Sequence, residues 1–272
     1  MSALEPPPDP RLRACVVVPA HDEEARVGAC LDALAAQVGV DPRDYEVLLV
    51  LDACTDATAA RACAVAERHP ALRLLLLDGS GRGSGPARAL GMSTACARLH
   101  ASGSPEGLIA TTDADSRVAP DWLSAQLAVA ARGAHAIGGR IELCPRERDL
   151  LPLGVVERHV ERGRERHAHL LADPKERRHA EHWQFSGASM AVTASTYAAV
   201  GGLPAGSDLE DERLEQALRN HGVTIERPLA VRVITSARTD GRASRGLARD
   251  LADACGLVPA DEPPLERSGW PG

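Results

Sequence analysis

Two aspartates stand one residue apart at the end of an apolar run in the middle of the chain. Asp113 and Asp115 follow residues 108–110, which read Leu-Ile-Ala and predict a buried strand. In an extended backbone, residues i and i+2 point to the same side, so both carboxylates would converge on one divalent cation, or on a ribose and a cation together. Carboxylate oxygens suit hard ions such as Mg²⁺ and Mn²⁺. The competing interpretation is a turn or a helix cap, where aspartate satisfies free backbone donors.

Strand-like and helix-like segments alternate around these aspartates. Apolar runs predict strands at residues 15–18, 46–51, 72–77 and 108–112, and helical patterns follow at residues 22–38, 55–69, 86–100 and 120–131. Four successive βα units with apolar strands predict a parallel sheet covered by helices on both faces. Right-handed crossovers then bring the loops after the strands to one rim. The sequence therefore predicts an acidic rim that includes residues 20–23, 52–56 and 113–116.

The loop after the third predicted strand is rich in glycine. Residues 79–85 read Gly-Ser-Gly-Arg-Gly-Ser-Gly, and a helix follows. The loop matches neither the dinucleotide fingerprint nor the P-loop, because its glycine spacing differs and it has no lysine. The following helix can still present N–H groups to an anion, with Arg82 and Arg88 as phosphate neighbours. A flexible connection is the alternative interpretation.

The second half of the chain has a less regular pattern. Strands are predicted at residues 136–143, 188–192, 223–225 and 229–234, and helices at residues 151–172, 194–200 and 209–221. This order predicts an α+β extension that packs on the first half, with no internal repeat. Glu210 and Asp211 open the last of these helices, where acids suit the helix dipole or where one of them acts as a general base.

Two other motifs of the second half have competing interpretations. Residues 187–191, Gly-Ala-Ser-Met-Ala, resemble a nucleophile elbow, for which Asp208 or Asp211 and His221 would complete a hydrolase triad. The match is imperfect, and it leaves the acidic rim unexplained. Histidines cluster within residues 159–182 and could bind a metal, but such a stretch is also typical of the solvated face of a charged helix. The clustered histidines are His159, His167, His169, His179 and His182.

Composition excludes several classes of protein. The chain has 272 residues, of which 44% are hydrophobic, so it can bury a substantial core. Its net charge of −7 argues against a general nucleic-acid binder. No stretch approaches the ~18 apolar residues that span a bilayer. Seven scattered cysteines without a Cys-x-x-Cys pair fit a reducing compartment. We therefore expect a cytoplasmic protein without a membrane span.

Taken in order, these motifs resemble the family 2 glycosyltransferases of the GT-A fold. The resemblance covers about residues 14–240, and the order and spacing of its short motifs are together specific. The motifs are residues 16–23 (Val-Val-Val-Pro-Ala-His-Asp-Glu), 50–56 (Val-Leu-Asp-Ala-Cys-Thr-Asp), 85–91 (Gly-Pro-Ala-Arg-Ala-Leu-Gly), 113–115 (Asp-Ala-Asp), 187–190 (Gly-Ala-Ser-Met) and 210–211 (Glu-Asp).

The resemblance implies an enzyme that moves a sugar from a nucleotide-diphosphate sugar with inversion, in a single displacement. It implies a GT-A-type α/β fold, a mainly parallel sheet with helices on both faces and a C-terminal α+β extension on the acceptor side. In it, Asp211 would be the base and Asp115 would ligate Mn²⁺ or Mg²⁺. The expected donor-binding residues, which include the two arginines of the glycine-rich loop and its helix, are Pro19, Ala20, His21, Glu23, Asp52, Arg82, Arg88 and Asp113. The expected acceptor-side residues are Gly187, Ala188, Ser189 and Glu210.

Two departures from the family pattern refine this expectation. Leu51 precedes Asp52, where the family usually carries two adjacent acids, and this departure concerns the residues that would bind the base of the donor. We expect a uridine nucleotide in the donor. Residues 216–220, Gln-Ala-Leu-Arg-Asn, replace the Gln-x-x-Arg-Trp of processive members. Together with the scarcity of aromatic residues, this departure predicts a small soluble acceptor, and we expect residues 151–182 to border its site.

Two rival functions share part of this pattern. A sugar-phosphate nucleotidyltransferase would normally place a glycine-rich basic loop after the first strand, where this chain has Ala-His-Asp-Glu at residues 20–23. A non-catalytic paralogue that binds a nucleotide sugar would not need Asp113, Asp115 and Asp211 together. For the organisation of the chain we predict a disordered N-terminus (1–11), one catalytic domain (12–256) and a flexible tail (257–272). The domain would comprise a nucleotide-sugar-binding half (12–132) and an acceptor-side half (133–256).

Overall fold

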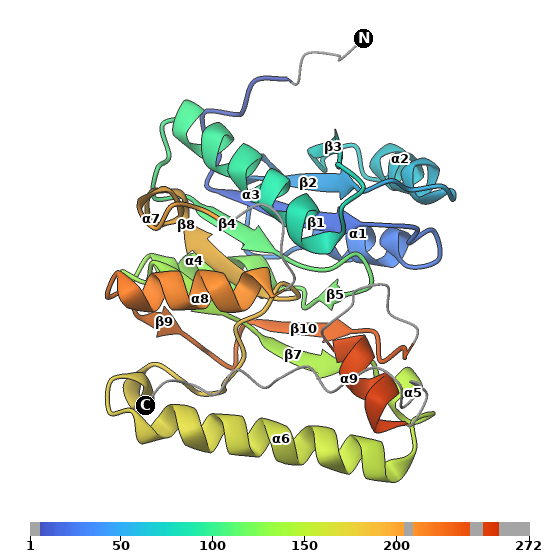
Figure 1. Ribbon diagram of the computed structural model, residues 1–272. Coiled ribbons are helices and arrows are strands. Elements are labelled where there is room, and N and C mark those ends of the chain that lie inside the picture. The colour runs from blue at the N-terminus through green and yellow to red at the C-terminus, as the bar shows by residue number, and fades with distance from the viewer. Residues whose placement is uncertain (1–5, 204–208, 240–246, 256–272) are drawn as a thin grey trace.

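The computed structural model describes residues 6–203, 209–239 and 247–255, and its core is a large twisted sheet (Figure 1). Within the described residues this sheet has seven strands in the order β3-β2-β1-β4-β8-β6-β9. β1 is parallel to β2 and β4, and β2 is parallel to β3, whereas β8 is antiparallel to β4 and β6. The predicted α/β class with a mainly parallel sheet is confirmed. The strands are β1 (Ala14–Ala20), β2 (Tyr45–Leu51), β3 (Leu74–Asp78), β4 (Leu108–Thr111), β6 (Ala136–Gly138), β8 (Met190–Thr193) and β9 (Ile225–Glu226).

Helices cover both faces of this sheet, as the strand pattern predicted. The side chains of β1 alternate between two cores, because successive residues of a strand point to opposite faces. Val16 and Val18 join the core under one set of helices, and Cys15 and Val17 join the core under the other. The first set is α1 (Val27–Ala35), α2 (Thr58–Arg68) and α4 (Trp122–Ala130); the second is α3 (Ser84–Ala101), α7 (Ala194–Ala199) and α8 (Glu210–Asn220).

A smaller sheet joins the two halves of the chain. Its strands are ordered β5-β10-β7, with β5 (Arg117–Val118) from the first half and β7 (Arg140–Leu143) and β10 (Arg232–Thr235) from the second. In Figure 1 the long helix α6 (Leu153–Ala172) lies beyond this sheet, at the bottom of the view. Val155 is the buried residue of α6, and it packs in a small core with Leu251 of α9 (Leu247–Ala254).

One predicted strand is wrong in an informative way. Residues 136–143 form two strands in different sheets, not one. The backbone N–H of Gly139 donates to Ser189 O of the large sheet (2.8 Å), and the N–H of Arg140, the next residue, donates to Val231 O (2.7 Å). The chain therefore changes its pairing partner at residue 139, which apolar periodicity does not reveal.

Other differences concern short elements and the ends of the chain. The predicted helix from residue 22 begins at Val27, because residues 21–26 form a loop of the rim. Elements without a predicted counterpart are β5, α5 (Pro145–Arg148), α9 and the 3-10 turns Pro42–Asp44 and Glu176–Arg178. Near the N-terminus, Asp9 accepts a hydrogen bond from Arg73 (2.9 Å). Residues 1–5 and 256–272 lie outside the described residues, and the predicted domain boundaries stay predictions.

Candidate active site

The loops that follow the parallel strands meet at one rim of the large sheet, as expected for strands that run the same way. Pro19 and Ala20 end β1 and are buried, and His21 is exposed beyond them. The Nδ1 atom of His21 lies 2.6 Å from the backbone oxygen of Asp52. The loops after β1 and β2 therefore lie side by side at the predicted place.

Asp52 organises the glycine-rich loop. Its two carboxylate oxygens accept hydrogen bonds from the backbone N–H groups of Gly81 (2.7 Å) and Gly83 (2.8 Å), and its side chain is buried. Both glycines have positive φ angles, of 71° and 100°, which residues with a Cβ rarely adopt. Arg82 between them is exposed and bonds to Ser80. The loop is thus shaped by a carboxylate, and donor binding by Asp52 and Arg82 stays a prediction.

Reciprocal hydrogen bonds tie the loop after β1 to the loop after β2. The Asp22 carboxylate accepts from the N–H groups of Thr55 (2.6 Å) and Asp56 (3.2 Å). In return, Asp56 accepts from the N–H of Glu24 (3.0 Å). Asp22, Cys54 and Asp56 have ligand atoms within 4.8 Å of one another. Because backbone donors already bond to both carboxylates, we assign this group to loop structure.

Asp113 and Asp115 lie in a turn, so the extended backbone assumed from the sequence is wrong. β4 ends at Thr111, and the N–H of Ser116 donates to Asp113 O (3.0 Å), which closes the turn. Aspartate suits such positions, as the competing interpretation held. The two carboxylates nonetheless stay candidates for ligand binding. Each of them forms an ion pair with a different arginine.

Arg88 joins three of the predicted motifs. Its guanidinium donates to Asp113 Oδ1 (2.7 Å), Glu210 Oε1 (3.0 Å) and the backbone oxygen of Gly187 (3.1 Å). Only 4% of the side chain is exposed. Burial disfavours its charged form, but the carboxylates of Asp113 and Glu210 outweigh burial and raise the pKa of Arg88 above its ordinary value. A Cβ at Gly187 would collide with this guanidinium, which explains glycine there.

Arg238 meets the other aspartate of the turn. Its Nη2 lies 3.0 Å from Asp115 Oδ2 and 2.6 Å from Glu23 Oε1. Thr235 also donates to Asp115 Oδ1 (3.4 Å). Burial and the nearby Asp113 carboxylate raise the pKa of Asp115 to about 6, although Arg238 opposes this. The carboxylate of Asp115 thus sits where negative charge is costly without a cation.

Asp211 stands at the start of α8, next to the Gly187 motif. Its Oδ2 accepts from the N–H of Gly187 (3.3 Å), and its Oδ1 accepts from the N–H of Glu212 (2.9 Å). Glu210, the residue before it, is buried against Arg88, so the two adjacent acids have different surroundings. A carboxylate has about four lone-pair sites, so Asp211 retains acceptor capacity toward a substrate.

The hydrolase interpretation fails on the position of its nucleophile. Ser189 is fully buried, and its Oγ accepts a hydrogen bond from Trp122 Nε1 (2.9 Å). His221 caps the opposite end of α8 from Asp211 and bonds to Ala217 O (2.9 Å). Asp208 lies outside the described residues. Ser189 is therefore a packing residue behind the acceptor-side motif, together with the buried Ala188.

The clustered histidines do not gather into a metal site within the described part of the chain. His179 pairs with Glu226 (2.6 Å), and His167 lies 3.4 Å from Ala180 O. Burial and the nearby Arg227 lower the pKa of His182 to about 4, so it is neutral at pH 7. These histidines serve packing and local pairing of the segment around α6.

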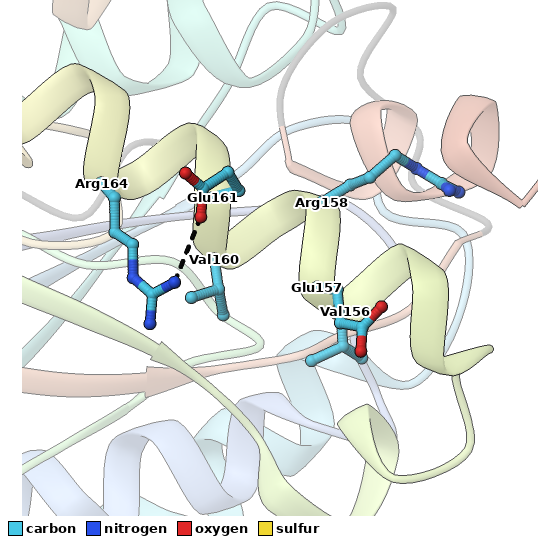
Figure 2. Close-up of a pocket in the computed structure, with 6 residues that line it drawn as sticks. All are labelled: Val156, Glu157, Arg158, Val160, Glu161 and Arg164. Atoms are coloured by element: carbon cyan, nitrogen blue, oxygen red, sulfur yellow. Dashed lines mark hydrogen bonds and ion pairs between the residues drawn. The ribbon is translucent and has the colours of Figure 1, made fainter.

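Two hollows differ in what they border. The larger lies along α6, and Figure 2 shows that its lining comes from this one helix, with Val156, Val160 and Arg164 among the residues. The smaller, of about 170 Å³, borders Asp115 and is lined also by Arg26, Arg117 and Glu147. Of the expected site residues, Asp115 is the one that lines the smaller cavity, so this cavity offers an approach to that carboxylate.

Sequence reasoning missed Arg238 and the residues that hold its segment. Glu147 accepts from Ser236 Oγ (2.6 Å) and from the N–H of Ala237 (2.7 Å), immediately before Arg238. The strand that leads to this segment was predicted from its apolar pattern. That strand pairs with β5, which follows Asp115 in the chain, and this tertiary pairing, which the sequence does not show, brings Arg238 to the rim.

Comparison with known proteins agrees with this geometry. The model for the glycosyl transferase family 2 matches residues 15–185, more than half of the chain. This chain belongs to glycosyl transferase family 2. The expected glycosyltransferase is thereby confirmed at the level of the family, and the match includes the rim loops and the turn with Asp113 and Asp115.

Similar proteins extend the comparison. A dolichyl-phosphate beta-glucosyltransferase of Drosophila melanogaster is 30% identical over 135 residues, which are 45% of this chain and 41% of that protein. The mannosyltransferase PcManGT from Pyrobaculum calidifontis, in complex with GDP-Man and Mn²⁺, has a TM-score of 0.57 at 23% identity and covers 88% of this chain and 60% of its own. S. aureus TarS 1-349 in complex with UDP-GlcNAc has a TM-score of 0.61 at 14% identity, over 90% of this chain and 66% of its own.

These likenesses establish the GT-A fold of this family 2 domain. The chain spans less than two thirds of each of the three proteins. One structural neighbour holds a guanosine nucleotide and another a uridine nucleotide, so the fold alone does not choose the base. Across its described residues, none of the helices combines the length and the apolar character that a bilayer crossing needs.

Proposed function

We propose that this family 2 domain transfers a sugar, with inversion, from a nucleotide-diphosphate sugar to a small acceptor. The observation that carries the proposal is the position of Arg88, which holds Asp113 of the expected donor side and Gly187 and Glu210 of the expected acceptor side around one guanidinium. Donor and acceptor would thus meet at one point. The nucleotide sugars in the complexes of PcManGT and TarS support the donor class, and a uridine donor remains our expectation.

The proposed general base is Asp211. Its contact with the N–H of Gly187 places its carboxylate beside the acceptor-side motif (3.3 Å). From there it would take the proton of the acceptor hydroxyl as that oxygen attacks the anomeric carbon from the face opposite the leaving diphosphate. A base that is aligned in advance contributes typically 10²–10⁴-fold to the rate.

The surroundings of Asp115 suit a divalent cation. The Asp115 carboxylate already accommodates a positive group, since Arg238 lies 3.0 Å from its Oδ2, and Asp113 and Glu23 add negative charge nearby. We propose that Asp115 ligates Mn²⁺ or Mg²⁺; Mg²⁺ in particular is often held by one or two carboxylates and substrate phosphates. Bound there, the ion would supply Lewis-acid stabilisation to the leaving diphosphate. The Mn²⁺ in the PcManGT complex supports this assignment.

The acceptor and the compartment complete the proposal. The scarcity of aromatic side chains gives few stacking platforms for a long glycan, which supports a small acceptor. The name of the Drosophila relative raises a second candidate, a lipid-linked phosphate, for this chain. The free thiols of all seven cysteines support our proposal of a cytoplasmic enzyme.

The experiment measures nucleotide release from a panel of nucleotide sugars, with small hydroxyl acceptors and with dolichyl phosphate offered in parallel. Asp211→Asn keeps the shape of the side chain but takes no proton at neutral pH, so turnover should fall by roughly 10²–10⁴-fold. Donor affinity and melting temperature should stay close to those of the wild type, because Asn keeps a side-chain oxygen that can accept from the N–H groups of Gly187 or Glu212. Glu212→Gln, on the same helical turn, is the matched control and should keep its turnover. Near-normal turnover in Asp211→Asn would remove Asp211 as the base.

A further inference from the structure

Arg238 occupies the side of Asp115 that a cation would use. Its Nη2 contacts Asp115 Oδ2 (3.0 Å) and Glu23 Oε1 (2.6 Å), so one guanidinium nitrogen bridges the turn after β4 and the loop after β1. The exposed fractions of the Arg238 and Asp115 side chains are 16% and 12%. A pair this well covered is screened less by water and salt than a surface pair.

The protein holds the segment that carries Arg238 in place. Glu147 of α5 accepts hydrogen bonds from Ser236 Oγ (2.6 Å) and from the N–H of Ala237 (2.7 Å). Burial opposes the charge of Glu147, but these two hydrogen bonds keep its pKa below the ordinary value. Thr235, one residue earlier, contacts Asp115 Oδ1 (3.4 Å). The position of the guanidinium on Asp115 is therefore set by its segment as well as by charge.

The space beside Asp115 gives an ion access to the same carboxylate. The cavity of about 170 Å³ borders Asp115 between the start of α1, β5 and the end of β10. It has room for several waters, each of which takes about 30 Å³. A hydrated cation can thus reach the carboxylate without passing through the packed core.

We propose that Arg238 competes with the divalent cation for Asp115 and thereby couples cation binding to donor binding. The proposal rests on the proposed function in one respect, that Asp115 is the cation ligand. Arg238 holds Oδ2 of Asp115 (3.0 Å), so an ion that takes this oxygen displaces the guanidinium. A displaced arginine suits the diphosphate of the donor, because its planar fork matches phosphate oxygens. The donor therefore favours the state in which the cation holds Asp115.

The test is calorimetric titration of the full chain with Mn²⁺ alone and then with Mn²⁺ in the presence of saturating UDP. Arg238→Met keeps a long side chain and removes the competing charge. Without UDP it should bind Mn²⁺ about three- to tenfold more tightly than the wild type, because the ion no longer displaces the guanidinium and desolvation keeps the net strength of the covered pair modest. UDP should then increase Mn²⁺ affinity less in Arg238→Met than in the wild type, since coupling is reciprocal between the two ligands.

Two further variants make the result specific. Arg117→Met removes the same charge from the lining of the same cavity, where Arg117 contacts the sulfur of Cys144 (3.9 Å) and not Asp115, and it should change Mn²⁺ affinity less than twofold. Asp115→Asn should lose Mn²⁺ binding in the wild-type and in the Arg238→Met backgrounds. Melting curves of each variant confirm that it is folded.

The outcomes separate the two proposals. Unchanged or weaker Mn²⁺ binding by Arg238→Met, with binding lost in Asp115→Asn, would overturn the competition and leave the cation site standing. Mn²⁺ binding that survives Asp115→Asn would place the cation elsewhere, and both the cation assignment and the competition would fall. An equal gain in Mn²⁺ affinity from Arg117→Met would mean that the loss of one positive charge explains the effect. It would also overturn the specific role of Arg238.

Discussion

Arg88 and Arg238 contact the same turn, residues 113–116, but their surroundings differ. Arg88 lies on helix α3, is 4% exposed, and bonds to Asp113, Glu210 and the backbone of Gly187. Arg238 lies in the segment after β10, is 16% exposed, and pairs with Asp115 and Glu23. One arginine joins three of the predicted motifs inside the protein. The other neutralises a carboxylate that a substrate-bound cation would use.

The difference shows that an arginine beside an expected metal ligand is not by itself a substrate-binding residue. We expected Arg88 to be a phosphate neighbour, and that role stays a prediction; its guanidinium donates to three partners inside the protein. Arg238 was not among the expected residues, yet it meets the proposed cation ligand. Burial and partner geometry, rather than residue type, decide which arginine is structural and which can be exchanged for another cation.

The largest expected effect is the loss of folding stability when Arg88 is replaced. Arg88→Met leaves the buried Glu210 carboxylate and Asp113 without their cation, and loss of one partner of a buried ion pair costs about 3–5 kcal/mol. Arg238→Met should cost less, about 1–2 kcal/mol, because the Arg238 side chain is 16% exposed and Asp115, one of its two partners, borders a cavity. Urea unfolding of both variants measures the difference. Equal losses would mean that both arginines are structural.

The second prediction concerns Asp115. Because its folded-state pKa is raised to about 6, the folded protein holds a proton that the unfolded chain releases. Stability contributed by this group is therefore complete at low pH and is lost as pH rises from about 4 to 6. Asp115→Asn should remove this loss and raise the free energy of unfolding at pH 7 by about 1–3 kcal/mol. Unfolding measured at pH 4 and pH 7 checks it; a less stable variant at pH 7 would show that the pair with Arg238 outweighs burial.

The third prediction sharpens the contrast within the turn. Asp113→Asn keeps an oxygen that can accept from Arg88 but removes the charge from a hydrogen bond of 2.7 Å. A charge-assisted hydrogen bond contributes more than a neutral one, so the variant should lose about 1 kcal/mol at pH 7. Two aspartates one residue apart should thus respond to the same substitution with opposite signs. Thermal unfolding of both variants in one buffer tests this, and a shared sign would contradict the two-arginine description.

The smallest expected effect on stability is that of a third arginine at the rim. Arg82 is exposed, and its Nε donates a hydrogen bond to Ser80 Oγ (3.0 Å). Arg82→Ala should change the free energy of unfolding by no more than about 0.5 kcal/mol. If Arg82 is a phosphate neighbour, the variant should weaken UDP binding severalfold in calorimetry. An unchanged affinity for UDP would show that Arg82 does not bind the phosphates of the donor.

The regular part of the fold was predictable because it repeats a local pattern. Apolar runs such as residues 46–51 and the helical periods between them depend on neighbours in the chain, and β1 to β4 with their helices follow from that pattern. The two-residue strand β5 had no predicted counterpart, because it is defined by its pairing with β10, a distant segment of the chain. The separation of β6 from β7 at Gly139 is likewise a tertiary event, since it depends on Ser189 and Val231.

In the candidate site too, some features could be predicted from the sequence and others depend on tertiary contacts. Asp113, Asp115 and Asp211 stand in motifs that a family resemblance identifies, so sequence was enough to select them. The contact between Arg238 and Glu23 spans 215 residues, and no local pattern predicts it. Sequence also could not show that the Asp113 turn is closed by Ser116, because aspartates one residue apart occur both in strands and in turns.

The carboxylate of Asp52 has a consequence for the mobility of the glycine-rich loop. Residues 79–85 contain four glycines, and a free chain of this kind loses much conformational entropy when a ligand orders it. Because Asp52 accepts from Gly81 and Gly83, much of that ordering has already happened before any ligand arrives. In amide hydrogen exchange these two N–H groups should be more protected than their neighbours in the loop. A donor that contacts the loop would then bind a surface already in its final shape.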